Sequence, residues 1–247
     1  MLRLRHPKWY ALLLLALGLV LFVSAAHWQW QRAQFKQARA DAFATALRSG
    51  RAPPLESVLN HQPTTDFALV RMAGALDSEH LLLLDNQVQR GVVGVQVFAV
   101  LRAAGGSAVL ADLGFVARPR DRSQRIVLPR MPATVNGIGL LTAAPAAGLR
   151  LGADHWAAPI RYPLLLTRIE PAALRALPGF PGIADPIIRL APDPASGFKR
   201  EWKLAGLSAD QHRGYALQWA SFAIAALVIF FLLHRPRPGV PDAASKA

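Results

Sequence analysis

Two histidines stand at corresponding ends of two long apolar stretches. His27 closes the stretch that begins at Trp9, and His212 precedes the stretch that ends at Leu233. If the two stretches pack as antiparallel helices, both imidazoles lie at the same end. An imidazole beside aromatic side chains suits a haem, whose iron takes an axial histidine and whose macrocycle takes an apolar pocket. The alternative is that both are ordinary interfacial residues, polar at the tip and apolar in the body.

Both apolar stretches are long enough to cross a bilayer. Residues 9–26 and 215–233 contain no charged side chain, and about 20 such residues in a helix span the hydrocarbon core. One arginine or lysine at the centre would raise the free energy of insertion by about 2.5–3.5 kcal/mol. Aromatic residues typical of membrane interfaces flank both stretches: Trp9, Tyr10, Trp28, Trp30, Tyr215 and Trp219. We predict transmembrane helices over 9–27 and 214–234.

Basic residues predict the orientation of these helices. They precede the first stretch and follow the second: Arg3, Arg5, Lys8, Arg235 and Arg237. Because positive residues stay on the cytoplasmic side, residues 1–8 and 235–247 are expected inside and residues 28–213 outside. The arginines within 28–213 do not contradict this, since long translocated segments largely escape the rule.

The first stretch has a second interpretation as a cleavable signal peptide. Ser24, Ala25 and Ala26 resemble the small residues of a cleavage site. However, the apolar run is longer than the usual segment of roughly 7–15 residues in a signal peptide. A polar helical segment, 29–47, also follows without a break, so we favour a retained anchor.

The segment between the spans is predicted to be rich in β-strands. Short runs of Val and Leu, bounded by Gly, Asn and Asp, predict strands over 67–75, 80–86, 92–101, 108–115, 134–142 and 187–191. The Gly105-Gly106 pair predicts a hairpin turn, and a polar hairpin-like region is expected over 199–204. The predicted fold class is therefore α+β: two terminal transmembrane helices flanking a sandwich or partial barrel.

Two further helices are expected in this segment. The first, 31–48, continues from the first span and ends at Gly50. Thr167 followed by Glu170 resembles a capping box, which predicts a second helix from there to Leu177.

Composition excludes several function classes. The chain has no cysteine, which excludes disulfides, thiolate metal sites and covalent haem attachment. The net charge is +13, but the arginines are scattered rather than clustered, which argues against nucleic-acid binding. A membrane-anchored periplasmic hydrolase lacks any nucleophile motif. It would need a Ser or Asp beside His61, His80 or His155 in a deep pocket.

Five short motifs, in order, resemble those of the Surfeit locus protein 1 family. The Trp-Gln-x-x-Arg-x-x-x-Lys motif that follows the first span in that family is matched by Trp28, Gln29, Arg32 and Lys36. The others are a strand ending at Gly74, then Asp85-Asn86 with Gly91 and Gly94, then 109–116, and then His212 with Tyr215 and Trp219. Leu113 and Phe115 stand where the family usually has Arg and Trp, and Arg213 stands where it has Leu.

The resemblance implies a non-enzymatic function in a bacterial inner membrane. Members of the family assist the biogenesis of haem–copper cytochrome c oxidase, and the implied cofactor is haem a, bound transiently on its way to subunit I. The implied partners are oxidase subunit I, the haem a synthase and the lipid bilayer, with no nucleic acid. An alternative is a membrane scaffold that contacts oxidase subunits and never binds haem.

The resemblance also implies roles for particular side chains. His212 would ligate the haem iron, and Trp28, Tyr215 and Trp219 would pack against the macrocycle. Arg32 or Lys36 would pair with the haem propionates through charge-assisted hydrogen bonds. The alternatives are that the two cations meet lipid phosphates and that the tryptophans form an aromatic belt at the interface.

Overall fold

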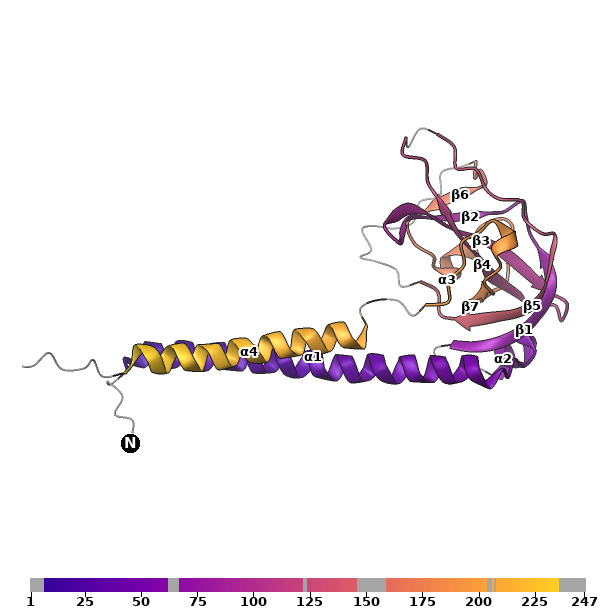
Figure 1. Cartoon of the computed structure of the whole chain (residues 1–247). Coiled ribbons are helices and arrows are strands. Elements are labelled where there is room, and N and C mark those ends of the chain that lie inside the picture. The colour runs from indigo at the N-terminus through magenta and orange to yellow at the C-terminus, as the bar shows by residue number, and fades with distance from the viewer. Residues whose placement is uncertain are drawn as a thin grey trace, which may run out of the picture. The chain divides into compact units, whose positions relative to one another are not determined.

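The computed structural model describes residues 7–61, 67–121, 124–145, 159–203, 206 and 208–235. The chain forms two compact units (Figure 1). One consists of Met1–Ala42 together with Leu204–Ala247, and the other of Phe43–Lys203. The described residues do not include Arg3, Arg5, His155 and Arg237, and only the backbone of His61 is described.

The first unit is a pair of antiparallel helices. α1 (Trp9–Ser49) runs without a break through the predicted polar extension, and Gly50, with φ +61°, ends it as expected. α4 (Ala209–Leu233) returns beside it, as Figure 1 shows. Phe22 stacks on Trp219 with ring centroids 6.0 Å apart, while Gln29 contacts His212 near the start of α4. The antiparallel arrangement on which the histidine argument depended is therefore confirmed.

A capping box fixes the start of α4. The Ser208 hydroxyl accepts a hydrogen bond from the Gln211 amide, and the Gln211 side chain accepts one from the Ser208 amide. Two donors of the first turn are thereby satisfied. The helix begins at Ala209, so His212 lies within its first turn.

The apolar surfaces of both helices are exposed. None of the most apolar window of α1 is buried within the protein, and only 11% of that of α4 is. Such a surface is unstable in water but suited to hydrocarbon. Both helices are therefore candidate membrane spans, and they indicate a membrane protein.

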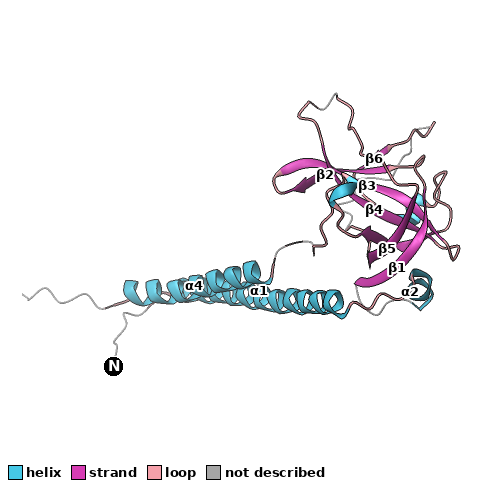
Figure 2. Cartoon of the chain, turned by 45° about the vertical axis from the view of Figure 1, so that its right-hand side comes forward, coloured by secondary structure: helices cyan, strands magenta, loops and turns pink. Residues whose placement is uncertain are grey.

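The second unit is built on a seven-stranded mixed sheet (Figure 2). Its strands are β1 (Phe67–Leu76), β2 (Leu82–Gln89), β3 (Val92–Ala103), β4 (Ala108–Ala117), β5 (Thr134–Thr142), β6 (Leu164–Leu166) and β7 (Ile183–Leu190). The pairings β1–β5–β7–β4–β3 return to β1, so five strands close into a ring. β2 and β6 extend the sheet from β3. The α+β fold class is confirmed. The sequence predicted a sandwich or a partial barrel, and the five strands form a closed barrel.

The ring closes where the end of β1 meets the end of β3. Gly74, Ala75 and Leu76 pair with Ala103, Arg102 and Leu101. A Cβ atom on Gly74 would overlap the Arg102 carbonyl oxygen. Only glycine therefore allows the two backbones to approach closely enough to pair.

Two hydrophobic clusters cover the two faces of the sheet. Inside the ring, side chains such as Val97, Leu101 and Ile188 are fully buried. Leu55 of α2 (Leu55–His61) is also buried in this cluster. Outside the ring, β2, β3 and β4 are covered by the segment around α3 (Pro171–Leu174), with Phe180 fully buried.

Some of the predicted elements are wrong. The helix predicted from Thr167 is limited to the four residues of α3, its N-cap is Glu170, and no side chain caps it. The hairpin predicted over 199–204 is instead a strap: Lys199 makes one bridge to Phe115, and residues 200–203 have no regular structure. Residue 204 lies outside the described residues. β6 and α2 were not predicted.

We expect Gly74→Val to destabilise the second unit by about 1–3 kcal/mol or more, the usual range for an overpacked site. Thermal unfolding of the full-length protein in detergent, followed by the circular dichroism of its β-structure, measures this. Gly214→Ala is the control, because that position in α4 has open space and alanine favours helix. An unchanged transition for Gly74→Val would show that the ring does not need this approach.

Candidate functional site

His212 is buried between the two helices and bonded to a residue of α1. Its side chain is 5% exposed, and its Nδ1 lies 2.6 Å from the Gln29 Oε1 atom. Because an amide oxygen can only accept, Nδ1 carries the proton in this arrangement. The lone pair then resides on Nε2, which is the tautomer that histidine adopts as a metal ligand when its other nitrogen donates to an oxygen.

Trp28 is the aromatic neighbour of this imidazole. Its indole meets the His212 ring edge-on with centroids 6.4 Å apart, and it is 58% exposed. Consecutive residues on α1 thus contact the same histidine, one through a hydrogen bond and the other through its ring. Of the predicted site residues, the structure brings together Trp28, in the middle of α1, and His212, near the start of α4.

The other predicted aromatic residues lie elsewhere on α4. Trp219 is two helical turns farther along and packs with Phe22 and Phe222, which places it in an aromatic cluster within the apolar stretch. Tyr215 is 45% exposed. Both are on the same helix as His212, but the contacts of the described residues do not join either of them to its ring.

The predicted cations lie on the extension of α1 beyond Gln29. The Arg32 guanidinium lies over the Phe35 ring at 5.1 Å, and Arg39 lies over the same ring at 5.8 Å. The Lys36 ammonium nitrogen lies 3.0 Å from the position that a Cβ atom on Gly206 would take. The side-chain contacts described for His212 are with Gln29 and Trp28, and they include neither of these two cations.

The sequence interpretation missed the role of Gln29. His27, the other histidine at this end of the apolar stretches, is bonded to Gln31 on its own helix at 2.9 Å. Gln29 and His212 are 183 positions apart, so no local pattern links them. The available signal was a polar residue inside the tryptophan motif at the end of an apolar helix.

A second polar cluster lies in the wall of the β-ring, around Asp112. Its carboxylate accepts hydrogen bonds from the Gln96 amide and from the Gly114 N–H at 3.0 Å. The Arg189 guanidinium lies 3.4 Å away. Burial raises the pKa of Asp112, against the lowering effect of Gln96, Arg189 and Gly114.

The Asp112 cluster holds the strap that leads toward α4. Arg189 donates to the carbonyl oxygens of Glu201 and Lys203, and Arg200 donates to those of Leu113 and Ala191. These bonds fix a segment that has no regular structure of its own. The cluster is therefore a structural clamp, and the cavity lined by Asp112 itself, together with Gln96 and Arg189, is too small for a ligand.

The third polar cluster pairs Asp77 with His80. The Asp77 carboxylate accepts hydrogen bonds from the amides of Glu79 and His80 at 3.0 and 3.2 Å, and its Oδ2 lies 3.0 Å from the imidazole Nδ1. The His80 ring packs against Tyr162, with centroids 4.9 Å apart. This pair supplies an Asp–His contact that a hydrolase would need, but the cavities described for this structure are lined by other residues.

A haem requires one axial ligand and not a cluster of ionisable residues. Among the described residues, no group of three or more His, Asp or Glu side chains is placed to hold a metal ion. A single buried imidazole with its Nδ1 already engaged is nevertheless a suitable donor set for haem iron. The chemistry of the residues at His212 therefore fits this group.

Two apolar terminal helices, joined to each other through a histidine–glutamine contact, and a closed β-ring formed by the sequence between them define a class of membrane proteins with one β-domain. The SURF1 (Surfeit locus protein 1) family model matches residues 16–224, and the chain belongs to this family. A comparison with curated proteins finds no match. SURF1 family proteins are linked to cytochrome oxidase assembly and are not known enzymes. The resemblance inferred from the five motifs is confirmed.

The Asp77–His80 pair predicts that the stability of the fold decreases at acidic pH. Burial raises the pKa of Asp77, but hydrogen bonds from the His80 side chain and from the backbone amides of Glu79 and His80 lower it by more. The pKa therefore lies below its usual 3.8. A carboxyl group with a lowered folded pKa stabilises the fold above its ordinary pKa and loses this contribution as the pH falls below it. We expect the unfolding temperature to fall below about pH 4, and to fall less steeply in Asp77→Asn. Identical pH profiles would contradict this assignment.

Proposed function

We propose that this protein holds haem a transiently where the middle of α1 meets the start of α4 and passes it to subunit I of cytochrome c oxidase. His212 is the axial ligand in this proposal, through its Nε2 atom. Haem a is insoluble and redox-active, so a carrier at the membrane edge limits its exposure. Because the haem must also leave, one axial ligand and modest affinity suit the task.

The observation that carries the proposal is the hydrogen bond between His212 and Gln29. It gives the imidazole the tautomer that a metal needs and restrains its ring. The edge of Trp28 against the same ring supplies an apolar wall. A histidine that served only as an interfacial residue would be expected at the surface, whereas this one is 5% exposed.

The remaining side chains have supporting roles in the proposal. Tyr215 and Trp219 pack against the apolar macrocycle, and Arg32 or Lys36 pairs with the propionates. Bound haem supplies the iron that the histidine ligates. We further propose that both termini, 1–8 and 235–247, are cytoplasmic and that residues 28–213 are periplasmic in a bacterial inner membrane. The haem a synthase is the expected donor.

A scaffold that binds no haem is the second candidate. One observation favours it: the imidazole is closely covered by the two helices, so iron can reach Nε2 only if neighbouring side chains move. In that case the histidine–glutamine contact serves to hold the two spans together.

Purification of the full-length protein after co-expression with a haem a synthase separates the two candidates. The carrier proposal predicts a Soret band in the visible spectrum and its loss in His212→Ala. The matched control is His27→Ala, which removes an exposed imidazole at the same end of the helix pair and should leave the band unchanged. A protein without a Soret band, or a spectrum unaffected by His212→Ala, would contradict the carrier proposal.

Gln29→Leu tests the supporting hydrogen bond. Loss of an outer-shell partner of a metal ligand commonly lowers affinity 10–100-fold, and we expect haem binding to weaken by about tenfold or more. Gln29→Glu should retain binding and lower the reduction potential of the bound haem, because a carboxylate makes the imidazole more basic. Gln31→Leu, which affects only His27, is the control. Equal affinity and potential in all three variants would remove Gln29 from the site.

A further inference from the structure

One seam in the wall of the β-ring, between β5 and β7, is incomplete and uncovered among the described residues. β5 pairs with β1 from Phe67↔Thr142 through Ala75↔Thr134, along its whole length. On its other side β5 pairs with β7 only over Gly139–Thr142. The first half of β5, Thr134–Ile138, therefore has no strand on this side among the described residues.

The backbone groups at this open edge can be assigned from the ladder. The Leu76 amide donates to the Ala133 carbonyl oxygen at 2.9 Å. Because residues of an antiparallel strand direct their N–H and C=O groups alternately to the two sides, Val135 and Gly137 bond toward β1. The N–H and C=O groups of Thr134, Asn136 and Ile138 are then directed to the open side, a row of donors and acceptors ready for another strand.

Two other incomplete seams in the ring are covered by segments of the chain itself. Beside β1, the Arg71 amide donates to the Pro53 carbonyl oxygen at 2.8 Å, and Pro54 bridges Arg71. Beside β4, the amides of Phe115 and Lys199 donate to each other's carbonyl oxygens at 2.9 and 3.0 Å. The described chain leaves the β5 edge uncovered in this way.

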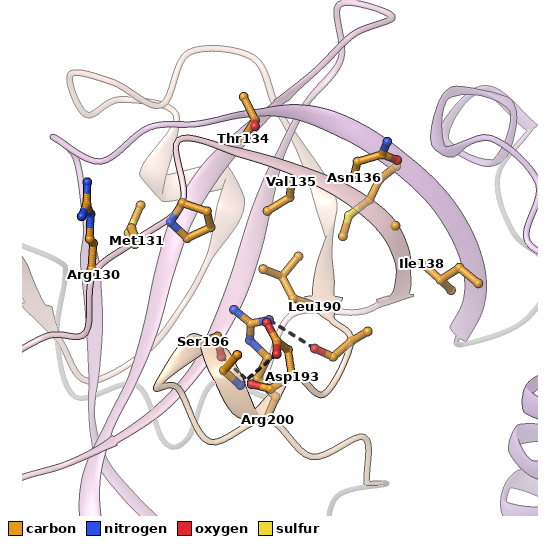
Figure 3. Close-up of a pocket in the computed structure, with 15 residues that line it drawn as sticks. Arg130, Met131, Thr134, Val135, Asn136, Ile138, Leu190, Asp193, Ser196 and Arg200 are labelled. Atoms are coloured by element: carbon orange, nitrogen blue, oxygen red, sulfur yellow. Dashed lines mark hydrogen bonds between the residues drawn. The ribbon is translucent and has the colours of Figure 1, made fainter.

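A cavity of about 620 Å³ lies along this edge. In Figure 3, Thr134, Asn136 and Ile138 follow the β5 ribbon on one side of it, and Asp193, Ser196 and Arg200 lie on the other. Its apolar lining comes from Met72, Met131, Val135, Ile138 and Leu190. The volume is within the range of ligand sites, roughly 300–1,000 Å³.

Two arginines give the cavity its charge. Arg130 is exposed at one end, next to Met131 in Figure 3. Arg200 donates to two carbonyl oxygens, so these contacts do not neutralise its guanidinium. The one carboxylate among the lining residues, Asp193, accepts a hydrogen bond from the Ala195 amide at 2.9 Å and also interacts electrostatically with Arg200, so the lining keeps a net positive charge through Arg130. The cavity is therefore complementary to acidic side chains.

We propose that this seam binds an extended, acidic segment of a partner polypeptide, which adds a strand to β5. The backbone of the segment pairs with Thr134, Asn136 and Ile138. Alternate side chains enter the apolar cavity beside Val135 and Leu190, and acidic side chains between them meet Arg130 and Arg200. A lipid or a nucleic acid lacks the regular amide row that this edge requires, whereas an extended polypeptide has it.

Amide hydrogen exchange of the full-length protein in detergent tests the seam directly. The probes are two eight-residue peptides, one of alternating glutamate and valine and one of alternating lysine and valine. We expect the amides of Thr134, Asn136 and Ile138 to exchange rapidly in the free protein and those of Val135 and Gly137 slowly. The glutamate peptide should slow the three open amides at least tenfold, and the lysine peptide should not.

Asn136→Pro removes one of the open-edge donors without removing a bond to β1, and proline is tolerated at such edge positions. It should weaken binding of the glutamate peptide by at least tenfold, while Asn136→Ala, which keeps the N–H, should not. Arg130 lies outside the strand pairing of β5. Arg130→Glu should therefore make the protein bind the lysine peptide more tightly than the glutamate peptide, which tests the proposal even if the proline variant unfolds. No protection by the glutamate peptide, equal binding of both peptides, or unchanged preference in Arg130→Glu would overturn the proposal.

Discussion

The requirement that backbone N–H and C=O groups find partners governs both units of this protein. In α1 and α4 each apolar stretch satisfies these groups within itself, which is what allows its surface to remain exposed to hydrocarbon. In the second unit the same requirement is met by closing the sheet, and closure depends on the absence of a side chain at Gly74. On one side of the first half of β5, no strand among the described residues meets this requirement, and a cavity lies along that edge.

The contact between Gln29 and His212 has a different origin. Apolar side chains gain little from packing together in lipid, so polar contacts contribute to helix association, by about 1–2 kcal/mol in model peptides. Here the contact lies at the end of the apolar stretches and joins the two helices. The same bond also orients an imidazole and selects its tautomer. Association of the spans and preparation of a metal ligand therefore depend on one pair of side chains.

Much of the fold could be predicted because its signals are local. The predicted strand 134–142 coincides with β5, and 92–101 and 108–115 each lie within an observed strand. The helix from Thr167 was wrong because the chain packs Phe180 and Ile183 against the outer face of the sheet, and this packing leaves only four helical residues. β6 was not predicted because a strand of three residues is too short to show an alternating sequence pattern. Its assignment depends on parallel pairing with β2, far away in the chain.

The candidate site shows the same division between local and distant information. Hydropathy was sufficient to place His212 near the end of a helix, and the motifs pointed to Trp28. The hydrogen-bond partner was not predictable, because it lies on the other helix and its selection depends on how the two helices pack. The strap was also missed, because the clamp around Asp112 and Arg189, and not any pattern of its own, holds it in place.

The two unusual residues of the 109–116 motif can be understood from their surroundings. Leu113 is the extra residue of a β-bulge, since Val97 pairs with Gly114 and Phe98 with Asp112. Its side chain is fully buried inside the ring, where an unpaired arginine would be strongly unfavourable. Arg200 from the strap reaches the Leu113 carbonyl oxygen instead.

Phe115 likewise keeps an aromatic ring directly against Gly94, whose missing side chain leaves room for it. Leu113 thus belongs to the interior of the ring, whereas Phe115 packs on the β3 backbone at Gly94, and the backbones of both residues bond to the strap. Neither involves Gln29 or His212, which belong to the helical unit. The family signature therefore consists of two separable parts, one that builds the ring and one that joins the helices. The departure in the second part, Arg213, bonds to Asp210 and Gln37 and leaves the contact between Gln29 and His212 in place.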